Sequence, residues 1–274
     1  MIRYATLAYG DGEAVYAQAS MLVISLLANA PEPCEFVVLT DHPERFEWLR
    51  DVVRIETLSA SQLQSWAGPS RFSMRQKIEA AAFGLTGSGP LVLIDADVIA
   101  TQPLDEFTSA LTAGARYMHK REFELSSSTR SGNVRLWREL RAGSFGRWQF
   151  RPADAMWNSG VIAVGPGDGA LLREALSLYD AMAAAGIRHF ATEQLVVGVV
   201  LERAGKLLEA RSWFTHYWGN KQLFTREIEH RLRHAREIGM TPADAAAELR
   251  MKPIQLPAEV RPGKVEKLRR WLRL

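Results

Sequence analysis

The sequence of 274 residues has almost no cysteine and no long apolar run, and each shortage excludes a class of protein. Cys34 is the only cysteine, so the chain forms no internal disulfide and builds no cysteine-rich zinc site. No stretch approaches the roughly 18 consecutive apolar residues of a membrane-spanning helix. The first residues lack the basic, apolar and small-residue order of a signal peptide. We therefore expect a cytoplasmic protein.

The sequence also has little net charge, only +3. A net charge this small gives no reason to expect nucleic acid as a partner. The basic excess lies in residues 261–274, which contain six basic residues and one acid, interspersed with Leu, Val and Trp. Such a segment suits peripheral contact with anionic lipid at the inner face of a membrane. A terminal helix packed on the domain with a solvated basic face explains the same residues, and the sequence leaves both open.

Strand-like and helix-like segments alternate through the first half of the chain. Apolar runs predict strands at 4–8, 35–40 and 52–58, and apolar spacing predicts helices at 14–29 and 73–85. This alternation is typical of an α/β fold with a mostly parallel sheet flanked by helices.

Residues 91–97 (LVLIDAD) are the most informative stretch. Four consecutive apolar residues predict a strand buried on both faces, which ends in Asp95 and Asp97. In extended backbone, residues two apart project to the same side, so both carboxylates face one point at the carboxyl edge of the sheet. Oxygen ligands in that place suit a divalent cation. Capping of the next element, or pairing of one carboxylate with a basic group, remains an alternative.

The second half of the chain is less regular. Residues 157–164 predict a turn that runs into a buried strand, and 120–150 show no periodicity. A long irregular insertion of that kind is usually functional or disordered. Thr241 has the position of an N-cap, with Pro242 as the first helical residue. Helices are predicted at 171–185, 192–205, 226–239 and 241–250.

Four short motifs follow one another between residues 90 and 221. They are LIDAD at 93–97, WNSGV at 157–161, TEQ at 192–194 and HYWGNK at 216–221. Each is weak alone, but their order and spacing resemble a GT-A-type glycosyltransferase. The nearest resemblance is to family 8, which includes glycogenin and bacterial lipooligosaccharide galactosyltransferases. It implies a Rossmann-like GT-A fold with a mixed, mostly parallel sheet.

The resemblance implies that Asp95, Asp97 and His216 hold Mn²⁺ (or Mg²⁺), which bridges the diphosphate of a nucleotide-sugar donor. Two carboxylates and one imidazole suit Mn²⁺ better than Mg²⁺. Without the paired aspartates, His216 would be better explained as a histidine of an aromatic cluster that donates to a backbone carbonyl.

The donor sugar is expected to contact Asn158, Glu193 and Gln194, the residues that the resemblance places nearest the reaction. Glu193 stands where the family usually has aspartate, and the extra methylene bears on which sugar fits. From the residues alone, 158–160 also suit a tight turn, and Glu193 suits the first turn of a helix. Asp154 is a weaker candidate for a further sugar-binding acid.

The rest of the donor is expected to lie along the end of the first strand and two basic segments. Thr6, Ala8 and Tyr9 correspond to positions that cradle the base and ribose, and Tyr9 could equally pack in the core. Arg75 and Lys77 resemble donor-binding basic residues, although both also suit solvated helix positions. Lys221 comes one residue earlier than in the family and lacks the Pro-Trp that follows there. The expected set also includes Ala96 and Gly219.

These expectations describe a metal-dependent glycosyltransferase that uses a UDP-sugar, retains anomeric configuration and has an unidentified saccharide, lipid-linked or protein acceptor. Residues 1–221 form the catalytic domain, 120–150 shape its acceptor side, and 222–274 form a helical, basic extension. Two alternatives remain. A dehalogenase-type Mg²⁺ phosphohydrolase also uses an Asp-x-Asp pair, but on its first strand and with a threonine where Ile99 stands. The other is a non-catalytic protein that binds nucleotide-sugars.

Overall fold

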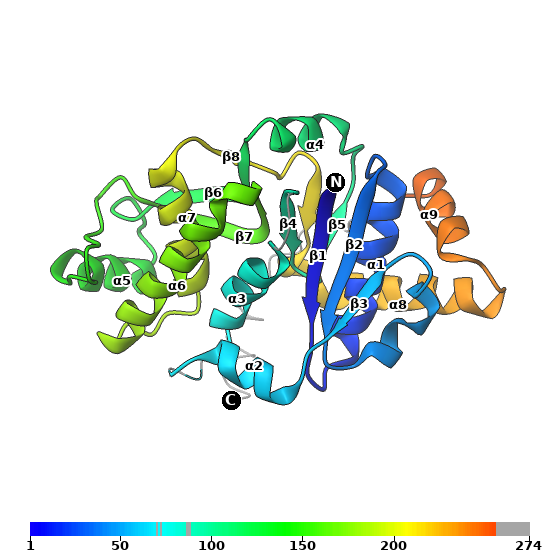
Figure 1. Ribbon diagram of the computed structural model, residues 1–274, viewed down its shortest axis with the longest axis horizontal. Helices are drawn as coiled ribbons and strands as arrows, with labels where there is room; N and C mark the ends of the chain where they lie inside the picture. The colour runs from blue at the N-terminus through cyan, green and yellow to red at the C-terminus, as the bar shows by residue number, and fades with distance from the viewer. Residues whose placement is uncertain (70, 72, 86–88, 256–274) are drawn as a thin grey trace, which may run out of the picture.

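A seven-stranded mixed sheet forms the centre of the computed structural model, which describes residues 1–69, 71, 73–85 and 89–255 (Figure 1). The strand order is β3-β2-β1-β4-β7-β6-β8. The strands are β1 (Ile2–Ala8), β2 (Cys34–Thr40), β3 (Arg54–Thr57), β4 (Leu91–Ile94), β6 (Arg116–Glu124), β7 (Ala155–Val164) and β8 (Leu207–Glu209). The fold is therefore α/β, as the sequence predicts.

Strand direction determines which residues meet at one edge of this sheet. Strands β1 to β4 are parallel, whereas β7 runs antiparallel to both β4 and β6. The second half of β7 therefore pairs with β4, and its middle reaches the carboxyl end of β4, where Val161 is opposite Ile94. The amide of Asp95 donates to the carbonyl of Gly160 at 2.9 Å. Two segments far apart in sequence thus share this edge.

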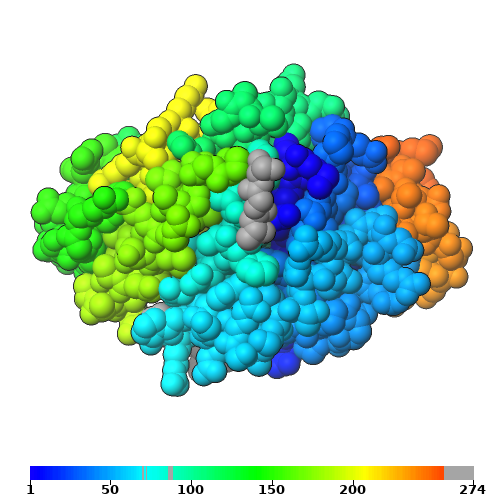
Figure 2. All heavy atoms as spheres, in the orientation of Figure 1, coloured from blue at the N-terminus to red at the C-terminus, as the bar shows by residue number. Residues whose placement is uncertain are grey.

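Helices cover both faces of the sheet because alternate strand residues point to opposite sides. Tyr4, Val38 and Val92 pack in the core on one face, and their neighbours Ala5 and Val37 belong to the core on the other. The first face carries α1 (Glu13–Asn29), α4 (Asp105–Thr112), α8 (Lys221–Glu237) and α9 (Pro242–Met251). The second carries α2 (Ala60–Ala67), α3 (Arg75–Gly84), α5 (Ser131–Ala142), α6 (Gly169–Ala184) and α7 (Thr192–Ala204). The space-filling view shows α2 and α3 in cyan between the blue N-terminal elements and the green helices (Figure 2).

A small second sheet joins the end of the aspartate motif to the last motif. It consists of β5 (Val98–Ala100) and β9 (Phe214–His216), which run antiparallel with Val98 opposite His216. A short 3₁₀ helix at Trp218–Asn220 then leads into α8. This pairing brings His216 next to Asp97 although 119 positions separate them in the chain.

The structure corrects three local predictions. Residues 120–150 are not an irregular insertion, because β6 continues to Glu124 and α5 follows, with Leu136 and Leu140 buried. No turn occurs at 157–160, because β7 begins at Ala155 and pairs with strands on both sides. The aspartate pair is not extended: β4 ends at Ile94, and the amide of Val98 donates to the carbonyl of Asp95 at 3.1 Å to close a turn.

The helices predicted in the second half are present within a few residues of the expected bounds. The Thr241 hydroxyl accepts the Asp244 amide and the Asp244 carboxylate accepts the Thr241 amide, so the predicted N-cap is a capping box. Sequence reasoning missed α2, β5 and β8. No helix in the described part of the chain is long and apolar enough to cross a membrane. The basic segment 261–274 lies outside the described residues.

Candidate functional site

Asp95, Asp97 and His216 form a cluster at the carboxyl end of β4. Each offers one ligand atom, and these atoms all lie within 4.8 Å of one another. Asp97 is buried, and the other two side chains are half-buried. His216 Nε2 lies 3.2 Å from Asp97 Oδ1, and Lys221 Nζ lies 3.0 Å from Asp97 Oδ2. Two carboxylates and one imidazole at this separation can hold a metal ion.

Asn158 orients the histidine of this cluster. Its Oδ1 accepts the backbone amide of Gly160 at 3.0 Å and lies 3.0 Å from His216 Nδ1. Because Oδ1 can only accept, Nδ1 carries the proton in this contact, and Nε2 is the nitrogen that faces the carboxylates. Such support from a neighbouring side chain is typical of metal-binding histidines.

Gly160 leaves just enough room for this histidine. A Cβ at position 160 would lie 2.6 Å from His216 Nδ1 and 3.1 Å from Asn158 Oδ1. No side chain fits there without moving one of these groups. The glycine of the WNSGV motif is therefore required by the close approach of β7 to His216 and not by a turn.

The charges around Asp97 keep it ionised. Burial acts to raise the pKa of this carboxyl, but hydrogen bonds and charges from His216 and Lys221 outweigh burial and hold the pKa well below its usual range. The carboxyl is therefore a carboxylate at neutral pH, which is the form that binds a cation.

A second chain of contacts leads away from Asp95 on the other side of β7. Lys77 Nζ, from α3, lies 2.6 Å from Asp95 Oδ1 and donates to the Ser159 hydroxyl at 2.9 Å. That hydroxyl donates to Glu193 Oε2, from α7, at 2.9 Å. Asn158 and Ser159 are adjacent in a strand, so they serve opposite sides of the sheet. Sequence reasoning did not single out Ser159, and reading 157–164 as strand throughout would have revealed it.

Glu193 is a buried carboxyl whose hydrogen bonding is incomplete. Burial raises its pKa to about 7, and the nearby Asp95 charge adds to this, while Lys77 and the Ser159 hydroxyl act in the opposite direction. Within the described residues, Oε1 is buried and has no hydrogen-bond partner. Buried polar atoms without a partner are rare in folded proteins, and one beside a cation cluster points to a functional role.

His119 is a further residue that sequence reasoning missed. It lies on β6, and its ring is perpendicular to the His216 ring with centroids 5.5 Å apart. Burial lowers the pKa of His119 to about 3, and the positive groups nearby, His216 first, lower it further. The ring is therefore neutral, and it packs against the ring of His216.

The residues expected at the nucleobase lie at the end of β1 and just beyond it. Thr6 and Ala8 are buried, and Tyr9 is half-buried, with a pKa that burial raises. Their strand is adjacent to β4, with Thr6 opposite Ile94. The loop after β1 is held by Asp41, whose carboxylate accepts the amide of Gly10. These positions are near the aspartate turn because β1 and β4 are neighbouring strands.

The remaining predicted residues differ in their surroundings. Arg75 is turned to other partners, since its guanidinium binds Asp180 at 2.8 Å and Glu79 at 2.6 Å. Ala96 lies in the aspartate turn, where its carbonyl accepts the Tyr217 hydroxyl at 3.4 Å. Gly219 is in the 3₁₀ helix before Lys221, and Gln194 is half-buried in the first turn of α7. Asp154 forms an ion pair with Arg203, which belongs to α7.

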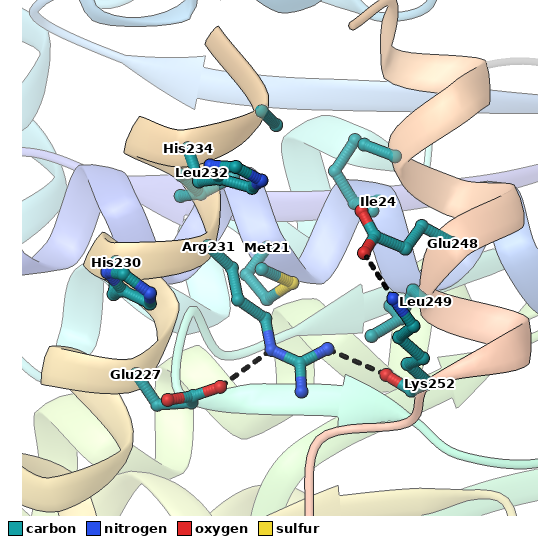
Figure 3. Close-up of a pocket in the computed structure, with 12 residues that line it drawn as sticks. Met21, Ile24, Glu227, His230, Arg231, Leu232, His234, Glu248, Leu249 and Lys252 are labelled. Atoms are coloured by element: carbon teal, nitrogen blue, oxygen red, sulfur yellow. Dashed lines mark hydrogen bonds and ion pairs between the residues drawn. The ribbon is translucent and has the colours of Figure 1, made fainter. Parts of the chain in front are cut away.

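A cavity of about 220 Å³ lies between α1, α8 and α9 and shares no residue with the metal cluster (Figure 3). Met21 and Ile24 form part of its apolar lining. Its charged groups pair along their own helices, Glu227 with Arg231 at 2.7 Å and Glu248 with Lys252 at 3.5 Å. Arg231 also donates to the Lys252 carbonyl at 2.7 Å, so polar groups of this cavity join α8 to the end of α9.

No protein-family model matches the chain, and no curated protein matches it. The chemistry of the site is therefore inferred from its own side chains.

Proposed function

We propose that this protein is a metal-dependent glycosyltransferase of the GT-A type that takes a sugar from a nucleotide-diphosphate donor. The observation that carries the proposal is the Asp95, Asp97 and His216 cluster at the carboxyl edge of an α/β sheet. Open α/β folds bind their ligands at this edge. The motif resemblance to family 8 supports the same assignment.

The residues of the cluster fit a divalent cation, and Mn²⁺ fits best. Two carboxylates and an imidazole provide a mixed oxygen and nitrogen donor set, for which Mn²⁺ is better suited than Mg²⁺. When bound, the cation supplies Lewis-acid stabilisation of the charge on the leaving diphosphate. Asn158 fixes the ring of His216 so that Nε2 is presented to that cation.

The other side chains have roles at the two ends of the donor. Lys221 is half-exposed beside Asp97, and its ammonium binds a phosphate oxygen when substrate is present. Glu193 presents Oε1, which lacks a partner in the described part of the chain, to a sugar hydroxyl, and Gln194 follows it at the start of α7. Thr6, Ala8 and Tyr9 receive the base, which we propose is uracil. We further propose that the sugar is transferred to an acceptor, not yet identified, with retention of its anomeric configuration.

A thermal-shift panel tests this function. UDP, UDP-sugars and other nucleotides are added with and without Mn²⁺, since a ligand at 100 times its Kd stabilises the native state by about 2.7 kcal/mol. We expect stabilisation by a UDP-sugar that depends on Mn²⁺, together with release of UDP in an assay of turnover. Stabilisation only by Mg²⁺ with a phosphate mimic would support a phosphohydrolase instead. Mn²⁺-dependent binding without any turnover would support a non-catalytic binding protein.

A further inference from the structure

Lys77 is an ammonium group held inside the proposed metal site. Its side chain is only 14% exposed, and its Nζ lies 2.6 Å from Asp95 Oδ1. Lys221 has the equivalent position on Asp97 but is 50% exposed, so it can leave towards solvent. Lys77 is mostly buried, so we expect its displacement from Asp95 to occur within the protein.

A divalent cation on Asp95 competes with this ammonium for the same carboxylate. Two positive charges a few ångströms apart in a poorly solvated site repel each other strongly. Retaining Lys77 on Asp95 therefore weakens metal binding, and the strength of that effect depends on whether the ammonium has another carboxylate to move to.

Such a carboxylate is present at the end of the contact chain. Ser159 links Lys77 to Glu193 through two hydrogen bonds of 2.9 Å. Glu193 is 4% exposed, and its buried Oε1 has no hydrogen-bond partner among the residues that the structure describes. The flexible four-carbon stem of lysine lets the ammonium exchange one acceptor for another. Glu193 Oε1 is therefore available as an acceptor for the Lys77 ammonium when a metal ion displaces it from Asp95.

We propose that Lys77 is the resident counterion of the metal-free site and moves from Asp95 to Glu193 when a divalent cation binds. Lys77 is then a positioning residue: its movement links occupancy of the metal site to Glu193, the carboxylate that faces the donor sugar in the proposed function. The inference rests on the metal site of the proposed function and does not depend on sugar transfer. It predicts energetic coupling between Lys77 and Glu193 that a fixed structural ion pair would not produce.

Mn²⁺ affinity, measured by calorimetry without nucleotide, tests this coupling in a double-mutant cycle of Lys77→Met, Glu193→Gln and both together. Lys77→Met should bind Mn²⁺ roughly tenfold more tightly, because the competing charge is gone. Glu193→Gln should bind it roughly tenfold less tightly, because the ammonium has lost its second carboxylate. In the Lys77→Met background, Glu193→Gln should have a much smaller effect. Lys206→Met, an exposed lysine on another part of the surface, is the matched control and should bind as the wild type does.

Unchanged or weaker Mn²⁺ binding by Lys77→Met would overturn the proposal, and so would strictly additive effects in the cycle. Crystals of the wild type with and without Mn²⁺ give a test that needs no variant to fold. With Mn²⁺, Lys77 Nζ should leave Asp95 and lie within hydrogen-bonding distance of Glu193 Oε1; an ammonium that stays on Asp95 refutes the movement. A protein that binds Mn²⁺ but transfers no sugar would contradict the proposed function and leave this inference intact, whereas a wild type that binds no Mn²⁺ would contradict both.

Discussion

Replacing Gly160 by alanine inserts a methyl group between β7 and the metal cluster. The new Cβ would lie 2.6 Å from His216 Nδ1 and 3.1 Å from Asn158 Oδ1. The first distance is far below van der Waals contact, so either the imidazole or the strand has to shift. The strand is held on both sides by β4 and β6, whereas His216 lies in a short two-stranded sheet. We therefore expect the ring to move.

The size of the effect of Gly160→Ala on stability and on Mn²⁺ affinity follows from the contacts that the His216 ring loses when it moves. The imidazole loses its 3.0 Å contact with Asn158 and its 3.2 Å contact with Asp97. Overpacking of a well-filled site costs about 1–3 kcal/mol of unfolding free energy. Loss of the group that orients a metal-binding histidine typically lowers metal affinity by about 10–100-fold. Gly160→Ala should therefore be folded, somewhat less stable and clearly weaker in Mn²⁺ binding.

Calorimetric titration with Mn²⁺ and urea unfolding of the metal-free protein measure the two effects separately. Gly132→Ala is the matched control, because a Cβ there meets nothing within 4 Å and the residue lies in helix α5. It should retain Mn²⁺ affinity and gain up to about 1 kcal/mol in stability. If Gly160→Ala binds Mn²⁺ as tightly as Gly132→Ala does, the close approach of β7 does not position His216 and the reasoning is wrong.

Three further predictions follow from single side chains. Asp97→Asn should fold but lose more than about 100-fold in Mn²⁺ affinity, because a buried anionic ligand is removed. Asp51→Asn, a change at an exposed position, is the control in the same titration. Equal Mn²⁺ affinities for the two variants would show that Asp97 is not a metal ligand. The pKa of Glu193 rises from 4.5 to about 7 on folding, so the native state holds a proton that the unfolded state has lost. Stability should then fall by up to about 3 kcal/mol as pH rises from 4.5 to 7, and level off above that. Glu193→Gln should abolish this dependence in urea unfolding with EDTA, and parallel pH curves for the two proteins would contradict it. Thr241→Ala should cost about 1 kcal/mol of unfolding free energy by removing the capping-box hydroxyl, with no change in Mn²⁺ affinity.

Local sequence signals were sufficient for most of the architecture. The apolar run 91–94 predicted a buried central strand, and the alternation around it predicted the α/β class, because both depend on burial patterns that neighbouring residues already display. Helix α5 was missed because only Leu136 and Leu140 in it are fully buried, which leaves a short and weak apolar spacing. The turn predicted at 157–160 was wrong because Trp157 and Asn158 pair with β6 and the Gly160 carbonyl accepts the Asp95 amide, which keeps this segment in β7.

The sequence by itself determined that two carboxylates of the candidate metal group lie together, since Asp95 and Asp97 are two positions apart and a short turn suffices to bring them together. It also placed His216 in the same group, but only through the order of motifs. The tertiary structure alone decided that Asn158 orients His216 and that Lys77, Ser159 and Glu193 form a chain behind Asp95. These residues come from α3, β7, α7 and β9, and no local pattern records which of them meet. The antiparallel pairing of β7 with β4 brings them together, because it places Asn158, Ser159 and Gly160 in the middle of β7 next to the carboxyl end of β4.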